Sequence, residues 1–333
     1  MRIWRKITKS QGEVSRCAVK IAIIVHVYYH ELWNELSQCV KRVAEPYDLY
    51  ITYQNEDVAK SVKEEYPEAK LIRVSNVGYD IWPFLKVLNT IKLEDYDYIL
   101  KLHTKRDIEG GATIEYVDVS GTRWRNRLLS FVSNANVWQK TISIMDECPE
   151  VGMVADPFLI FDGKVCSLGG EFERSLDISA HLGLEKPEKF KFVGGTMFLV
   201  RSQIFKCLQG VWHERDFDGG VNHRVGSLAH VIERLFGVCC YAKGYRILDC
   251  LGVVDNIESE LRIKKIIFGM RRFLYQKKIT KKGYNLVKIL RLPVLRRKVS
   301  GGTCIKRQDE YLYSAKKKCV EKYDLKLQGI GRL

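Results

Sequence analysis

The sequence predicts an α/β domain with a mainly parallel central sheet, followed by a basic helical extension. Short apolar runs typical of strands alternate with stretches of helical periodicity, and 333 residues with 46% hydrophobic content suffice to bury a core. This alternation is typical of parallel sheets whose two faces are covered by helices. In chain order, the predicted strands and helices of the first half are 20–28, 31–43, 47–53, 57–66, 69–74, 82–91 and 96–102.

The second half of the chain is less regular but contains the same kinds of segment. We predict strand-like segments at 151–155 and 247–254 and a helix at 227–236. Between them lie an apolar segment at 158–161 and the segment 192–201, which contains Gly194-Gly195-Thr196. The composition changes near residue 255. We therefore expect one domain over 1–255 and a separate tail over 256–333.

The net charge of +15 belongs to this tail. Residues 1–260 hold 33 basic and 36 acidic side chains, whereas residues 261–300 hold 14 basic side chains and no acidic one. Residues 301–333 hold 8 basic and 4 acidic side chains. A basic tail on a slightly acidic domain indicates an anionic binding partner for the tail alone.

The apolar residues of the tail follow helical spacing between cationic side chains. They are Ile263, Ile266, Ile267, Met270, Phe273 and Leu274, and then Leu286, Ile289 and Leu290 before Pro293. This composition is typical of an amphipathic helix in an anionic membrane interface. The alternatives are docking on the preceding domain and nucleic-acid binding, and the second is disfavoured because no known nucleic-acid-binding fold accompanies the charge.

Cysteine usage and hydropathy indicate a cytoplasmic protein at the inner face of the membrane. The ten cysteines include no C-x-x-C pair, and several lie in apolar runs, as reduced thiols do. The longest apolar run, 21–29, is too short to span a bilayer, and no apolar stretch follows the basic residues of 1–10. We therefore expect neither a membrane-spanning helix nor a signal peptide.

Several segments together resemble the rhamnan synthesis F family of bacterial glycosyltransferases, across roughly residues 20–250. They are His26-Val27-Tyr28-Tyr29 with Leu32-Trp33, Gly78-Tyr79-Asp80-Ile81-Trp82-Pro83-Phe84, residues 96–105, Trp124-Arg125, Gly194-Gly195-Thr196-Met197-Phe198 and residues 230–236. The resemblance implies a GT-A-like nucleotide-sugar-binding fold. It also implies inverting transfer of rhamnose or a similar sugar from a donor such as dTDP-rhamnose to a lipid-linked surface polysaccharide or O-antigen acceptor.

The loops after the first and third predicted strands are candidate donor-binding segments. His26 and Tyr28 reach the carboxyl edge of the sheet, where an aromatic ring can stack on a base. Asn76, Gly78 and Asp80 lie in the next such loop, where a carboxylate can bind ribose hydroxyl groups. The structural alternatives are a core histidine at position 26 and helix capping by Asp80.

The end of the fourth predicted strand carries cations where most GT-A enzymes carry Asp-x-Asp. Lys101, His103 and Lys105 share one face of an extended segment, and we assign them to the donor diphosphate. A lysine can neutralise the leaving diphosphate as a metal would, so we expect no metal ligand and no required cofactor. Asp107 can offer one oxygen ligand, so a magnesium or manganese site is one alternative. The structural alternative is that these charges are a solvated run at the end of a strand.

Two further segments are candidate acceptor- or sugar-binding sites. Trp124 offers a flat apolar face, and Arg125 can bind phosphate or sugar hydroxyl groups. Gly194, Gly195 and Thr196 lie where a strand would begin, which indicates close approach of the backbone to a ligand. A core tryptophan, a surface arginine and a simple bulge are the structural alternatives.

The general base is predicted only as a short list: Asp216, Asp218, His230 and Glu233. In the resembling family an aspartate precedes the glycine that matches Gly226, whereas this chain has Val225. An ion pair between Glu233 and Arg234 is the structural alternative. These departures also leave open a catalytically silent sugar-binding or scaffolding subunit of a polysaccharide assembly complex.

Overall fold

The structure is a computed structural model that describes most of the first 250 residues and three strands of the tail. The described residues are 19–108, 113–114, 117–118, 121–217, 226–250, 275–279, 284–289 and 292–298.

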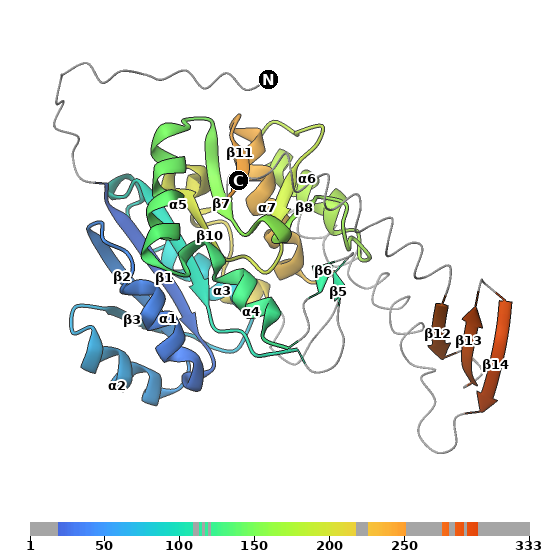
Figure 1. Cartoon of the computed structure of the whole chain (residues 1–333). Helices are drawn as coiled ribbons and strands as arrows, with labels where there is room; N and C mark the ends of the chain where they lie inside the picture. The colour runs from blue at the N-terminus through green and yellow to red at the C-terminus, as the bar shows by residue number, and fades with distance from the viewer. Residues whose placement is uncertain are drawn as a thin grey trace, which may run out of the picture.

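A seven-stranded sheet forms the centre of the described domain (Figure 1). Its strands, in spatial order, are β11 (Arg246–Asp249), β7 (Val151–Ala155), β10 (Phe198–Arg201), β4 (Tyr98–His103), β1 (Ile21–Val27), β2 (Tyr47–Tyr53) and β3 (Lys70–Arg73). Among these seven, β10 alone is antiparallel to its neighbours. The other strands therefore end at one common edge of the sheet.

Two short antiparallel pairs of strands accompany the central sheet. They are β5 (Thr113–Ile114) with β6 (Val117–Asp118), and β8 (Ile160–Asp162) with β9 (Lys191–Val193). The 3₁₀ helices of the described domain are η1 (His30–Leu32), η2 (Leu93–Asp95), η3 (Ser130–Val132), η4 (Pro157–Leu159), η5 (Ser202–Leu208) and η6 (Glu214–Asp216).

Helices cover both faces of the central sheet. One face packs against α1 (Trp33–Val40), α2 (Glu56–Glu65), α4 (Arg123–Leu128) and α5 (Ala135–Glu147). The other packs against α3 (Ile81–Leu88), α6 (Glu171–His181) and α7 (Leu228–Ala242). Side chains alternate across β1, so Ile23 and Val25 belong to the first core whereas Ala22 and Ile24 belong to the second.

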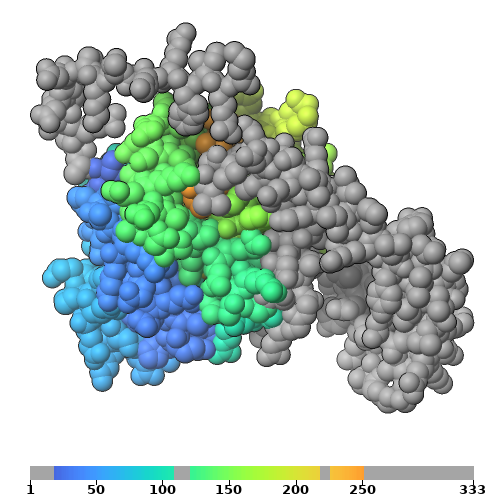
Figure 2. Space-filling model, in the orientation of Figure 1, coloured from blue at the N-terminus to red at the C-terminus, as the bar shows by residue number. Residues whose placement is uncertain are grey.

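The elements that enclose the first core adjoin one another on one face of the molecule. In the space-filling view, the N-terminal segments in blue adjoin the α4–α5 region in green without a break (Figure 2). The predicted mixed α/β domain with a mainly parallel sheet is confirmed in this part of the chain. No described helix is long and apolar enough to cross a membrane.

Residues 192–201 belong to two strands in different sheets. β9 ends at Val193 and β10 begins at Phe198, and the chain reverses between them. Gly195 and Thr196 have φ values of +80° and +57° there, so their backbone cannot continue a strand. The two glycines therefore mark a turn.

The predicted helix of the tail is wrong for residues 284–289. The chain forms a three-stranded antiparallel sheet of β12 (Tyr275–Ile279), β13 (Tyr284–Ile289) and β14 (Leu292–Lys298), in which Val287 pairs with Leu295. β-branched residues at 287 and 289 favour an extended backbone, and Pro293 is tolerated because β14 is an edge strand. The earlier predicted helix over 261–274 and the boundary at 255 lie outside the described residues.

The backbone of α7 packs closely on β9 at Gly237, and this contact generates a stability prediction. A Cβ atom there would overlap the carbonyl oxygen of Lys191 and lie 3.0 Å from Cβ of Phe192. We expect Gly237→Ala to destabilise the protein by about 1–3 kcal/mol in urea unfolding. Helix propensity alone would make the alanine variant more stable by about 1 kcal/mol. The predicted loss of stability therefore has the opposite sign to the change that helix propensity would give.

Ala180→Gly, on the exposed face of α6, is the control that measures propensity without packing. A Gly237→Ala protein as stable as the wild type would contradict the close packing of α7 on β9.

Candidate functional site

A cavity of about 430 Å³ opens at the carboxyl edge of the parallel strands. Its wall combines charged side chains with a large apolar surface, as ligand sites commonly do. The lining residues are Tyr79, Asp80, Ile81, His103, Lys105, Trp124, Phe161, Val165, Cys166, Leu168, Glu171, Phe192, Gly194, Gly195, Thr196, Ala229, His230, Glu233 and Arg234.

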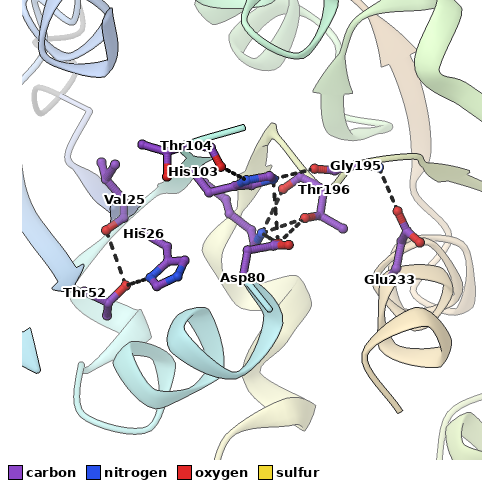
Figure 3. A network of polar contacts seen from close by, with 10 residues as sticks. Val25, His26, Thr52, Asp80, His103, Thr104, Gly195, Thr196 and Glu233 are labelled. Carbon is purple, nitrogen blue, oxygen red and sulfur yellow. Dashed lines mark hydrogen bonds and ion pairs between the residues drawn. The ribbon is translucent and has the colours of Figure 1, made fainter. Parts of the chain in front are cut away.

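The floor of this site is a buried ion pair between Lys101 on β4 and Asp80 before α3 (Figure 3). The Lys101 ammonium is 1% exposed and lies 2.5 Å from Asp80 Oδ2. It also donates to the carbonyl oxygen and to Oγ1 of Thr196, at 3.0 and 2.7 Å. Its three N–H groups thus have three acceptors, as an ionised lysine requires when it is buried.

Asp80 is correspondingly held as a carboxylate. Burial alone would raise its pKa, but His103 and Lys101 beside it, with hydrogen bonds from Lys101 and Thr196, hold the pKa well below its usual range. The Thr196 hydroxyl donates to Oδ2 at 2.5 Å. Asp80 was predicted to bind donor or to cap a helix. It occupies the N-cap position of α3 without a side-chain capping bond, and it lines the cavity.

The turn between β9 and β10 is held from both sides of the cavity. His103 Nε2 donates to the carbonyl oxygen of Gly195 at 2.8 Å, and the Gly195 amide donates to Glu233 Oε1 at 2.7 Å (Figure 3). Burial lowers the pKa of His103, and its other ring nitrogen, Nδ1, lies 3.1 Å from the carbonyl oxygen of Thr104. Glu233 of α7 is thereby fixed at the cavity wall through the turn.

Backbone strain is concentrated at the cavity. The described non-glycine residues with positive φ are Tyr79, Cys166 and Thr196, at +55°, +53° and +57°. All three line the cavity. Such conformations cost on the order of 1–3 kcal/mol each and persist where the surrounding structure requires them, commonly at binding sites.

Two further polar side chains of the wall have groups available to a ligand. Lys105 follows β4, and its ammonium has no hydrogen bond or ion pair with any residue that the structure describes. Its carbonyl oxygen accepts a hydrogen bond from Arg125. His230 on α7 shares a hydrogen bond of 2.7 Å between Nδ1 and the Ser227 hydroxyl, which leaves Nε2 available. Together with Glu233, they provide a cation, a carboxylate and an imidazole around one cavity.

The other predicted donor residues lie outside the cavity wall. His26 is buried against Thr52, 3.0 Å from ring nitrogen to hydroxyl, and burial lowers its pKa to about 3. Tyr28 is 41% exposed and accepts a 3.4 Å hydrogen bond from Asn76. Gly78 packs under Phe217 with φ +64°. The structure thus gives His26 the neutral core position that was the alternative to donor contact.

Neither Arg125 nor Asp216 lines the cavity, and each is held by other residues. Arg125 forms ion pairs with Asp107 and Glu35, so its guanidinium is already paired. Asp216 accepts a hydrogen bond from the His213 amide at 2.9 Å and belongs to a capping box. Asp218 lies outside the described residues. Of the predicted bases, His230 and Glu233 line the cavity.

Sequence reasoning missed Glu171 and gave Arg234 only a structural role. Both are buried, at 1% and 3% exposure, and both line the cavity. Arg234 bonds to the carbonyl oxygens of Gly163, Val165 and His230 instead of pairing with Glu233. Gly169-Gly170 before Glu171 is a turn signal that locates this loop, but no pattern reveals that the glutamate faces inward.

The described residues contain no group of three His, Cys, Asp or Glu side chains placed to hold a metal ion. Asp107, the predicted alternative ligand, is paired with Arg125. Asp80 Oδ2 lies 3.8 Å from Nε2 of His103, the last residue of β4, and it is paired with Lys101.

The buried ion pair generates a second prediction. Lys101→Met leaves the Asp80 carboxylate buried without its cation, so we expect the free energy of unfolding to fall by about 3–5 kcal/mol. Lys101→Met combined with Asp80→Asn should lose less, because the uncompensated charge is then absent. Urea unfolding monitored by circular dichroism measures both.

Lys206→Met is the matched control, since it breaks an exposed pair with Glu94 in which both side chains are more than half exposed. A loss for Lys101→Met no larger than for Lys206→Met would argue against an ionised buried pair.

Comparison with known proteins identifies relatives of this chain. Two curated relatives, both named "Uncharacterized protein WxcX", come from two strains of Xanthomonas campestris pv. campestris. Each is 24% identical over 254 residues, which cover 75% of this chain and 34% of the relative. The chain thus spans about a third of the length of the curated relatives it matches.

A solved structure of CMP:2-keto-3-deoxy-manno-octonic acid synthetase complexed with CTP aligns with 75% of this chain and 99% of its own. The identity is 10% and the TM-score is 0.33, and a similarity this low supports no statement about fold or function. The family described as rhamnan synthesis protein F matches residues 2–245, far more than half of the sequence. The chain belongs to the rhamnan synthesis protein F family.

Proposed function

We propose that this protein is a glycosyltransferase of polysaccharide synthesis with a GT-A-like domain. In this proposal it transfers rhamnose or a similar sugar from a nucleotide donor such as dTDP-rhamnose to a lipid-linked surface polysaccharide or O-antigen acceptor. The observation that supports it best is the cavity at the carboxyl edge of the sheet, where Lys105, His230 and Glu233 line one space. Membership in the family supports the polysaccharide context.

Lys105 is the proposed electrostatic partner of the leaving diphosphate. It has no counter-ion among the described residues, and it lies at the end of β4, where the negative charge of a donor would face the parallel strands. A preorganised cation stabilises charge that develops in the transition state. Lys101 is buried beneath this region, and His103 lines the cavity beside Lys105.

Glu233 is the proposed general base, with His230 as its neighbour on the same helix. The Gly195 amide fixes Oε1 of Glu233, and Oε2 remains able to accept a proton from an acceptor hydroxyl. Residues three apart on a helix share a face, so both side chains reach the same bound substrate. Inverting transfer needs one such base opposite the leaving group.

The proposal predicts a specific ranking of variants in a transfer assay with nucleotide sugars and a lipid-linked acceptor. We expect Glu233→Gln to lower kcat about 10²–10⁴-fold, through loss of proton transfer. Lys105→Ala should lower it about 10²–10³-fold, through loss of charge stabilisation. His230→Gln, Asp216→Asn and Asp218→Asn complete the series, and we expect Asp216→Asn, in its capping box, to have the smallest effect.

The same assay with EDTA, and with magnesium or manganese added back, tests the role of Lys105. Turnover that persists in EDTA is the expected result, and its abolition would contradict the lysine assignment. A wild-type protein that binds nucleotide sugars but neither transfers nor hydrolyses them would instead indicate the silent sugar-binding subunit.

The basic tail is the proposed contact with anionic lipid at the inner face of the membrane. Residues 261–300 carry 14 cations and no acid, and a lipid-linked acceptor is confined to that surface. We expect flotation with vesicles that contain phosphatidylserine, because each cation near the surface contributes up to about 1 kcal/mol. Replacing Lys264, Lys265, Arg271 and Arg272 by Gln should reduce flotation, as should high salt.

Phosphatidylcholine vesicles and duplex DNA are the controls. Equal binding to neutral vesicles, or binding to DNA in preference to anionic vesicles, would refute the membrane assignment.

A further inference from the structure

Glu171 is a buried carboxylate in the cavity that pairs with no cation among the residues that the structure describes. It is 1% exposed, and Oε2 accepts a hydrogen bond of 2.8 Å from the Gly169 amide. Oε1 has no hydrogen bond to any residue within the described ranges, and no ion pair involving Glu171 is formed there. Glu171 is the first residue of α6.

Arg234 supplies a buried positive charge in the same cavity. Its guanidinium donates to the carbonyl oxygens of Gly163, Val165 and His230, and it lies over the Phe192 ring at 4.6 Å. Three of its five N–H donors are used in this way. Within the part of the chain that the structure describes, no carboxylate lies within ion-pair distance of it.

Charges of opposite sign that line one cavity without pairing favour a neutral, hydroxyl-rich ligand. A hydroxyl group can donate to Glu171 and accept from Arg234, and it carries no charge that either residue would repel. The Glu171 carboxylate would repel a phosphate or a uronate, and the Arg234 guanidinium would repel an amine. Phe161, Phe192 and Leu168 add apolar surface to this wall, which suits the C–H face of a pyranose.

We infer that the wall formed by α6, α7 and β9 is a binding subsite for a neutral pyranose of the acceptor, with Glu171 as its specificity-determining carboxylate. The assignment to the acceptor rests on the proposed transfer reaction, in which the wall around Lys105 takes the donor diphosphate. The saccharide chemistry itself depends only on Glu171, Arg234 and the apolar surface between them.

Ligand-observed NMR titration of the full chain with simple glycosides tests the subsite directly. The probes are methyl rhamnoside, methyl glucoside and methyl glucuronide, the last two of which differ at C6 by a charge. We expect the neutral glycosides to bind and the glucuronide to bind at least about tenfold more weakly, because Glu171 repels it. Glu171→Gln should weaken binding of the neutral glycosides about 10- to 100-fold, as loss of a charged hydrogen-bond acceptor does.

Glu173→Gln, an exposed residue in the same helical turn, is the matched control and should bind as the wild type does. Gln at 171 can still accept from the Gly169 amide, and a melting curve identifies a variant that has lost its fold. The comparison of glucoside with glucuronide needs no variant at all.

Three outcomes would overturn the subsite: no binding of neutral glycosides by the wild type, tighter binding of the glucuronide, or equal binding by a folded Glu171→Gln protein. Failure of the transfer reaction is a different result. A wild-type protein that binds neutral glycosides through Glu171 but transfers no sugar refutes the proposed function and leaves the subsite standing.

Discussion

The buried Lys101 ammonium is the interaction on which the rest of the site depends. It joins three segments distant in sequence: β4, the residue before α3, and the turn between β9 and β10. Because a buried cation needs all of its acceptors, none of these segments can shift without exposing an unpaired charge. Thr196 both accepts from Lys101 and donates to Asp80, which explains how its positive φ is sustained. The strain of the turn is offset by charged hydrogen bonds.

The same turn connects the two groups of polar side chains around the cavity. His103 binds the carbonyl group of Gly195 and Glu233 binds its amide, so one peptide segment links β4 to α7. A side chain at Gly195 would overlap Leu128 and approach Trp124 within 3.0 Å, so α4 also constrains the turn. One reversal of the chain thus holds both His103 at the end of β4 and Glu233, the proposed base.

The fold was largely predictable because its signal is local. Strands 47–53 and 151–155 have the predicted bounds, and the alternation of apolar runs with amphipathic helices identified the parallel sheet. The sequence also identified half of the cavity, including His103, Lys105, Thr196 and Glu233. It did not reveal that Lys101 is buried, since its partners are 21 and 95 residues away. Glu171 escaped notice for the same reason. Residues 284–289 were misjudged because a short apolar run bounded by Gly and Pro fits both the helical and the strand period.

The central position of β10 has a consequence for how the chain is made. Strands β1 to β4 can pair with one another once residue 103 has been synthesised, because β2, β3 and β4 each pair with a strand that precedes them in the chain. β7 has no such neighbour: within the central sheet it pairs only with β10 and β11, and both follow it in the chain. Its five residues, all buried in the finished domain, must remain without sheet partners until β10 leaves the ribosome. An apolar strand without sheet partners can associate with the same strand of another chain. Aggregation during synthesis is therefore favoured most while residues 155 to 198 are being added.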